Sequence, residues 1–129
     1  LQCEVETNGT VEPNADRAGA VSLWNGSPKL GNSGVSPDRR EASRALHAFA
    51  GMDNAIFKFV IVDPEDAAEA SRLAERFSVS PARTVLMPEG TTAEAILDRS
   101  RWLAEVCVER GVRFSTRLHI LLWGDRRGV

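Results

Sequence analysis

Three short polar segments carry the residue types that could do chemistry in this chain of 129 residues. They are residues 7–10, 27–29 and 87–90, and each follows a predicted strand. Together they offer hydroxyl groups, backbone N–H groups, one ammonium at Lys29 and one carboxylate at Glu89. This set suits a small ligand that carries both a carboxylate and an amine, because Lys29 could pair with the carboxylate while Glu89 or loop carbonyls hold the amine.

These groups suit binding rather than catalysis. The sequence has no Ser–His–Asp trio, no P-loop and no GxGxxG motif. Its two cysteines, Cys3 and Cys107, are far apart and make neither a zinc pattern nor a disulfide framework. We expect both to be free structural thiols in a reducing cytosol. Residue types and spacing alone predict an α/β module that binds a small polar metabolite.

The composition of the chain excludes further classes of protein function. The net charge of −2 argues against a protein that binds nucleic acids or membrane surfaces, which would need a basic field. No apolar run approaches the ~18 residues of a membrane span. The length predicts one domain, residues 1–129.

The three polar segments need a scaffold that brings them together. Five strands are predicted, at residues 3–7, 20–24, 56–62, 83–86 and 113–123. Helices are predicted after Ser36, Asp63 and Thr91, and Thr91 forms a capping box with Glu94. Strands that alternate with helices indicate a parallel sheet, either open and doubly wound or part of a β/α barrel. In both folds the working face lies at the carboxyl ends of the strands.

One charged residue interrupts the apolar strand at 56–62. Lys58 either extends its ammonium out to water from the strand or projects into a site, and the sequence leaves both readings open.

Four motifs together resemble a known family. They are residues 6–10 (ETNGT), 27–30 (SPKL) with 32–34 (NSG), 58–60 (KFV) and 117–124 (RLHILLWG). In this order they resemble the 7-carboxy-7-deazaguanine synthases, radical S-adenosylmethionine enzymes of queuosine and deazapurine biosynthesis.

The resemblance implies a fold, a reaction and a set of partners. The fold would be part of an incomplete β/α barrel of the radical S-adenosylmethionine type, with about five mostly parallel strands and helices outside. The reaction would convert 6-carboxy-5,6,7,8-tetrahydropterin to 7-carboxy-7-deazaguanine, using S-adenosylmethionine, a [4Fe-4S] cluster and Mg²⁺. Partners would be the pterin substrate and an electron donor such as flavodoxin, with no nucleic acid and no membrane. The location would be the cytoplasm, and a homodimer is left open.

The resemblance also implies site residues, although no catalytic residue and no metal ligand is assigned. Substrate contacts would come from Thr7, His119 and the carboxylate of Val129. S-Adenosylmethionine contacts would come from Gly9, Ser27, Pro28, Lys29, Met87, Pro88, Glu89 and Gly90.

The family's three-cysteine cluster motif and its magnesium ligand belong to an N-terminal part that this sequence does not contain. Cys3 and Cys107 cannot replace that motif, because such a cluster needs three thiolates held together. We therefore expect this chain to be the C-terminal portion of such an enzyme, inactive by itself. The alternatives are a non-catalytic α/β metabolite-binding module and a radical S-adenosylmethionine activase with another substrate.

Overall fold

Five parallel strands form one sheet in the order of the sequence. The computed structural model describes residues 1–40 and 43–126, so Val129 lies outside the described residues. The strands are β1 (Glu4–Thr7), β2 (Leu23–Gly26), β3 (Ala55–Ile61), β4 (Thr84–Pro88) and β5 (Arg113–Phe114). A doubly wound sheet would reverse its strand order at a switch point, whereas this order continues without reversal, as in a β/α barrel.

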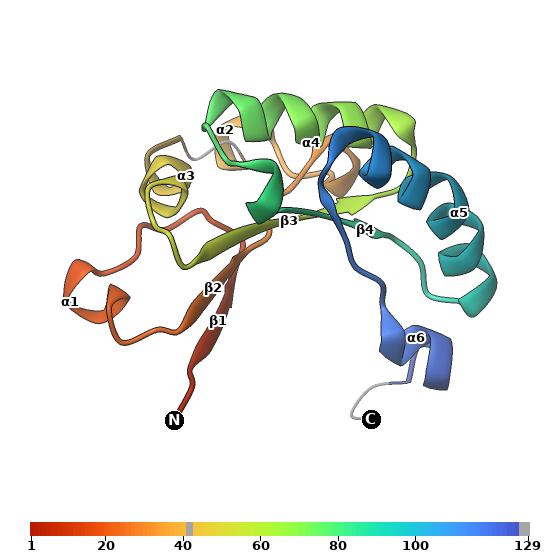
Figure 1. Cartoon of the computed structure of the whole chain (residues 1–129), viewed down its shortest axis with the longest axis horizontal. Helices are drawn as coiled ribbons and strands as arrows, with labels where there is room; N and C mark the ends of the chain where they lie inside the picture. The colour runs from red at the N-terminus through yellow and green to blue at the C-terminus, as the bar shows by residue number, and fades with distance from the viewer. Residues whose placement is uncertain (41–42, 127–129) are drawn as a thin grey trace.

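The helices lie outside the sheet, as predicted. They are α1 (Ala15–Ala18), α2 (Pro37–Arg40), α3 (Ser43–Ala50), α4 (Pro64–Arg76), α5 (Ala93–Arg110) and α6 (Leu118–Trp123), with short 3-10 turns at Gly31–Ser33 and Pro81–Arg83. In Figure 1 the sheet forms an arch, with α3, α4 and α5 over its outer side. The N-terminal end of the chain and α6 lie at the two feet of the arch.

The central strand β3 shows why the sheet has a closed and an open face. Its side chains alternate: Phe57, Phe59 and Ile61 are buried among the helices, while Lys58 and Val60 are half-buried on the opposite, inner face. The outer face therefore carries the core, to which α4 contributes Ala67, Ala70, Leu73 and Ala74. The inner face keeps room for a ligand.

Helix caps follow the sequence signals with one correction. Asp63 and Asp66 form a reciprocal capping box at the start of α4, and Gly111 ends α5 with φ +65°. The predicted cap at Thr91 is wrong by one residue. Thr92 caps α5 instead, because its hydroxyl accepts the backbone N–H of Ala95 at 3.2 Å.

The end of the chain is the main error of the sequence prediction. Residues 113–123 do not form one strand: β5 covers Arg113–Phe114, and α6 follows at Leu118–Trp123. Ile120 is the buried contact of α6, while Leu118 and Leu122 are exposed. A short apolar run does not distinguish a strand from a short helix, which is the physical reason for the error.

Smaller differences concern single elements and residues. The second strand covers Leu23–Gly26 instead of the predicted residues 20–24, so it starts and ends later in the sequence. Leu97 is 50% exposed, although its spacing from Ala93 in the sequence is that of an apolar helix face, which predicts burial. Cys107 is buried as expected, but Cys3 is exposed. Within the described residues, no helix combines the length and the apolar character that crossing a membrane requires.

Candidate functional site

Two adjoining cavities lie at the carboxyl ends of β1 to β4, on the inner side of the arch. The first has a volume of about 340 Å³ and is lined by Glu6, Thr7, Asn8, Ser27, Lys29, Lys58, Val60, Met87 and Arg117. The second has a volume of about 350 Å³ and is lined by Pro28, Lys29, Leu30, Asn32, Ser33, Val60, Val62, Glu89 and Arg117. All three polar segments that the sequence singled out contribute to these walls.

The loop after β1 is fixed by its own side chains. The Thr7 hydroxyl accepts a hydrogen bond from the Gly9 N–H at 3.1 Å, and the side-chain Oδ1 of Asn8 accepts one from the Thr10 N–H at 3.2 Å. The Ser27 N–H donates to the Thr7 carbonyl at 2.7 Å, which ties this loop to the one after β2. Because these contacts are local or between neighbouring strands, the hydroxyl and amide groups are held in place before any ligand arrives.

Gly9 serves the fold at this position. Its φ is +72°, and a Cβ there would lie 2.9 Å from Leu46 Cδ2 of α3. Gly9 is buried and does not line either cavity, so its predicted contact with S-adenosylmethionine stays a prediction.

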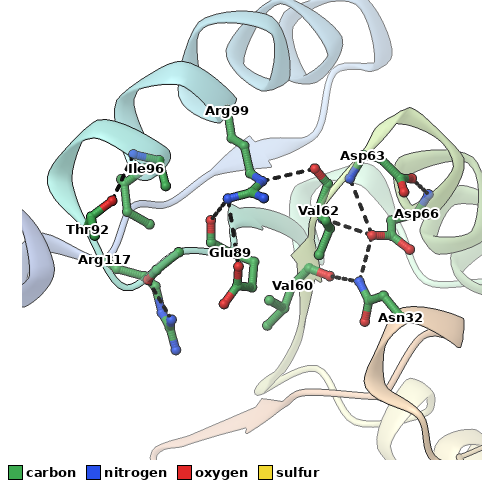
Figure 2. A network of polar contacts seen from close by, with 12 residues as sticks. Asn32, Val60, Val62, Asp63, Asp66, Glu89, Thr92, Ile96, Arg99 and Arg117 are labelled. Carbon is green, nitrogen blue, oxygen red and sulfur yellow. Dashed lines mark hydrogen bonds and ion pairs between the residues drawn. The ribbon is translucent and has the colours of Figure 1, made fainter. Parts of the chain in front are cut away.

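The loop after β2 is held from the α4 side. Asn32 donates from Nδ2 to the Val60 carbonyl at 3.1 Å and to Asp66 Oδ2 at 2.6 Å. The same Asp66 oxygen accepts the Val62 N–H at 2.8 Å, and Asp66 is only 6% exposed. Figure 2 shows this network, in which one buried carboxylate joins the loop, the end of β3 and the first turn of α4.

The loop after β4 is held by two arginines. Arg99 of α5 donates from Nη1 to the Glu89 carbonyl at 2.9 Å and from Nε to the Val62 carbonyl at 3.0 Å. Arg117 donates from Nη1 to the Gly90 carbonyl at 3.0 Å. The Glu89 carboxylate lies 3.7 Å from Arg99 Nη1 and remains partly exposed. In Figure 2, Arg99 and Arg117 lie on either side of the turn that contains Glu89.

Lys58 resolves the question that the sequence left open. Its Nζ lies 2.8 Å from Glu6 Oε1, and both residues line the first cavity, so Lys58 projects into the site. The hydrogen bond and the positive charge of Lys58 lower the pKa of Glu6 below its usual value. Lys29 and Lys58 are the two lysines of the whole sequence, and the first cavity is lined by both.

The described residues hold no cluster of three or more His, Cys, Asp or Glu side chains that could bind a metal ion. Cys3 precedes β1, whereas the Cys107 thiol contacts the carbonyl of Arg113 in β5, so the two thiols lie at opposite edges of the sheet. Burial raises the pKa of the Cys107 thiol, which the charge of Arg110 only partly offsets. These two thiols do not fit the ligand set of an iron–sulfur cluster.

The predicted site residues therefore divide into two groups. Those that line the cavities are Thr7, Ser27, Pro28, Lys29, Met87 and Glu89. Pro88 and Gly90 are buried in the wall behind them, and His119 is exposed on α6 without lining either cavity.

Arg117 and Glu6 are cavity residues to which sequence reasoning gave no role. A signal for Arg117 existed, since it opens the motif at 117–124, but its place depends on where β5 ends. Glu6 is separated from Lys58 by 52 positions along the chain, and only the strand register brings the two together.

A larger cavity of about 550 Å³ lies between α4 and α5 on the outer side of the sheet. Its walls include Ala68, Ser71, Ala74, Leu86 and Val112. Although it is larger, we place the functional site at the carboxyl ends of the strands. The loop hydroxyls and charged groups meet there, whereas the outer cavity separates two helices packed on the core.

Comparison with known proteins finds relatives that share one name. No protein-family model matches the chain. Proteins named 7-carboxy-7-deazaguanine synthase from Pyrobaculum aerophilum and Halobacterium salinarum are 32% and 35% identical to it, over 97% and 94% of its length. A third, from Rhodopirellula baltica, is 28% identical over 97% of the chain.

The chain resembles part of a 7-carboxy-7-deazaguanine synthase. The similarity confirms the resemblance read from the four motifs, and it extends over almost every residue of the chain. The chain spans about half the length of these synthases, 54%, 54% and 52% respectively. All four motifs contribute residues to the cavities at the carboxyl ends of the strands.

Proposed function

We propose that this chain is the C-terminal, ligand-binding part of an enzyme that converts 6-carboxy-5,6,7,8-tetrahydropterin to 7-carboxy-7-deazaguanine. The observation that carries the proposal is the similarity to synthases of this name over 94% or more of the chain. Its structural support is that the four motifs, dispersed in sequence, meet around two joined cavities.

The second cavity has the groups that S-adenosylmethionine would need. A methionyl carboxylate requires a cation, and within residues 1–40 and 43–126 the Lys29 ammonium has no hydrogen-bond or ion-pair partner of its own. A methionyl amine requires an acceptor, and the partly exposed Glu89 carboxylate supplies one. Leu30, Val60 and Val62 supply an apolar wall for the nucleoside. If bound here and cleaved by one-electron reduction, S-adenosylmethionine would supply the carbon radical that removes a hydrogen atom from the substrate.

The first cavity would then hold the pterin. Thr7 and Asn8 are positioned by hydrogen bonds of 3.1 Å and 3.2 Å within their own turn. Glu6, kept ionised by Lys58, offers a carboxylate acceptor to the N–H groups of a pterin ring. These residues bind and orient the substrate, and we assign no proton transfer to any of them.

Other components of the reaction would come from outside the described residues. Cys3 and Cys107 do not fit a [4Fe-4S] cluster, so its ligands, together with the Mg²⁺ ligand, would belong to other residues of a longer protein. An electron donor such as flavodoxin would supply the reducing electron. The free thiols favour a reducing compartment, the cytoplasm.

The test is an assay of the complete reading frame that contains this chain. The protein is reconstituted without oxygen and incubated with S-adenosylmethionine, reductant, Mg²⁺ and 6-carboxytetrahydropterin, and 7-carboxy-7-deazaguanine is detected by mass. We expect product from the wild-type protein and a loss of at least ~10-fold in Lys29→Ala, since a hydrogen bond to a charged group contributes roughly 1.5–3 kcal/mol.

Arg101→Ala is the matched control, because this arginine is 80% exposed on α5 and lines neither cavity. It should retain activity. Deoxyadenosine without the deazaguanine product would contradict the proposed substrate and point to an activase-like reaction. Absence of both, in a protein that holds a reduced cluster, would leave a binding module.

A further inference from the structure

Two cations lie where the two cavities meet. Lys29, Val60 and Arg117 line both cavities. Lys29 follows β2, Val60 belongs to β3, and Arg117 follows β5. The junction is therefore lined by residues from strands on either side of the sheet's centre and from β3 itself. A ligand that extends from one cavity into the other would therefore contact a junction lined by Lys29 and Arg117.

Both cations retain donors for a ligand. A guanidinium has five N–H donors, and Arg117 uses its Nη1 to hold the Gly90 carbonyl at 3.0 Å. No other hydrogen bond or ion pair of the Arg117 side chain occurs in the described part of the chain. The hydrogen bond to Gly90 fixes the guanidinium near the junction without neutralising its charge, because its acceptor is a carbonyl.

The nearby carboxylates already have partners. Glu6 is bound to Lys58 at 2.8 Å, and Glu89 lies 3.7 Å from Arg99. Within residues 1–40 and 43–126, Lys29 and Arg117 are therefore two positive charges without a carboxylate partner, and both line the same two cavities. Since like charges held together repel, an anionic ligand group would lower the energy of this arrangement.

We propose that Arg117, together with Lys29, binds one carboxylate group of a ligand at the junction of the two cavities. A guanidinium matches a carboxylate with two parallel hydrogen bonds, which makes Arg117 the residue that sets its orientation. The proposal rests on the proposed function for the choice of ligands. The carboxylate comes either from the methionyl group of S-adenosylmethionine or from position 6 of the pterin.

The experiment compares each ligand with its counterpart that lacks the carboxylate. S-Adenosylmethionine is paired with decarboxylated S-adenosylmethionine, and 6-carboxypterin with pterin. Dissociation constants are measured by calorimetry on the full 129-residue chain, and the Nε–Hε signal of Arg117 is followed by NMR. The variants are Arg117→Gln and Arg117→Lys, and Arg113→Gln is the matched control, because Arg113 is exposed on β5 and lines neither cavity.

The expected result is selective. Arg117→Gln should weaken one carboxylated ligand by about 10- to 100-fold, in line with the cost of a lost charged hydrogen bond. Binding of its decarboxylated counterpart should change less than ~2-fold, which also shows that the variant is folded. The affinity of Arg117→Lys for this carboxylated ligand should lie between those of Arg117→Gln and the wild type, and the affinity of Arg113→Gln should equal that of the wild type. The ligand that loses affinity identifies the source of the carboxylate.

Three outcomes would overturn the proposal. One is an equal loss for a ligand and its decarboxylated counterpart, which would make Arg117 a structural residue. Another is equal binding of both members of each pair by the wild-type chain. The third is no movement of the Arg117 signal on addition of either carboxylated ligand. Failure of the synthase assay with a positive result here would refute the proposed reaction and keep the carboxylate site.

Discussion

At the scale of single residues, the contact between Glu6 and Lys58 makes a prediction about pH. Lys58 lowers the pKa of Glu6, so this ion pair stabilises the fold when Glu6 is ionised, and that stability is lost as the pH falls through the lowered pKa. Because Glu6 is 74% exposed, the pair contributes about 0.2–1 kcal/mol. Lys58→Met should move the pKa of Glu6 back toward its ordinary value, measured by NMR titration of its carboxyl carbon. Lys29→Met, which removes the other lysine of the cavity, should leave it lowered.

Gly9 and Gly34 make a matched pair for a second prediction. Both have positive φ, +72° and +69°, but a Cβ on Gly9 would lie 2.9 Å from Leu46 while a Cβ on Gly34 meets nothing within 4 Å. Gly34→Ala should therefore cost only the left-handed backbone penalty, about 1–2 kcal/mol. Gly9→Ala should destabilise the chain more, since the buried Leu46 side chain must also move. Urea unfolding of both variants checks the order, and equal losses would mean that the contact with Leu46 carries no cost.

Part of the site was predictable from the sequence for a simple reason. Thr7, Lys29 and Glu89 each follow a strand, and parallel strands bring their carboxyl ends to one edge, so their proximity needed no knowledge of distances. No such rule predicts the positions of the Lys58 and Arg117 side chains. The direction of Lys58 depends on which face of β3 the helices cover, and the place of Arg117 depends on β5 ending at Phe114.

At the scale of the elements, the two adjacent threonines before α5 have different roles. The Thr92 hydroxyl accepts the Ala95 N–H, whereas Thr91 precedes the cap and is exposed. Thr92→Ala should cost about 1 kcal/mol of stability through the loss of this hydrogen bond. Thr91→Ala should leave the stability nearly unchanged in the same thermal unfolding experiment. A larger loss of stability in Thr91→Ala than in Thr92→Ala would mean that Thr91 caps the helix, as the sequence predicted.

Asp66 makes a prediction about a whole loop. Its carboxylate accepts the Val62 N–H and the Asn32 amide, so Asp66→Ala leaves buried donors without an acceptor. We expect a loss of about 1–3 kcal/mol for the unsatisfied groups, and faster hydrogen exchange at Gly31 to Ser33. Glu65→Ala is the control, because Glu65 is an exposed acid in the same first turn of α4. Unchanged exchange in Asp66→Ala would show that the loop does not depend on this network.

Elements differ in how far the sequence specifies them. The strand at β3 carries a long apolar run and was predicted within one residue at each end, and the start of α4 was predicted from the cap at Asp63. Residues 113–123 carry a short apolar run without a cap signal, and α6 indeed has no side-chain cap. Its helical state depends on packing that brings Ile120 to a buried position, which local sequence does not encode.

At the scale of the whole molecule, the five-stranded arch explains why half of a synthase-like length can hold an organised site. The core lies between the sheet and the helices on the outer side, so loop positions on the inner side are supported by residues of this chain alone. The cavities on the inner side are walled by β1 to β4, their loops and Arg117. We therefore expect ligands to bind on the inner side, although the larger cavity lies on the outer side.

One measurement tests this central claim most directly. Backbone amide signals of the chain are assigned by NMR, and S-adenosylmethionine is added in increasing amounts. The account predicts shifts at Ser27, Lys29 and Glu89, with none at Ser71 or Val79 in the cavity between α4 and α5. Shifts confined to Ser71, Val79 and their neighbours would contradict it, because the ligand would then bind the outer cavity and the loops at the carboxyl ends would not form the site.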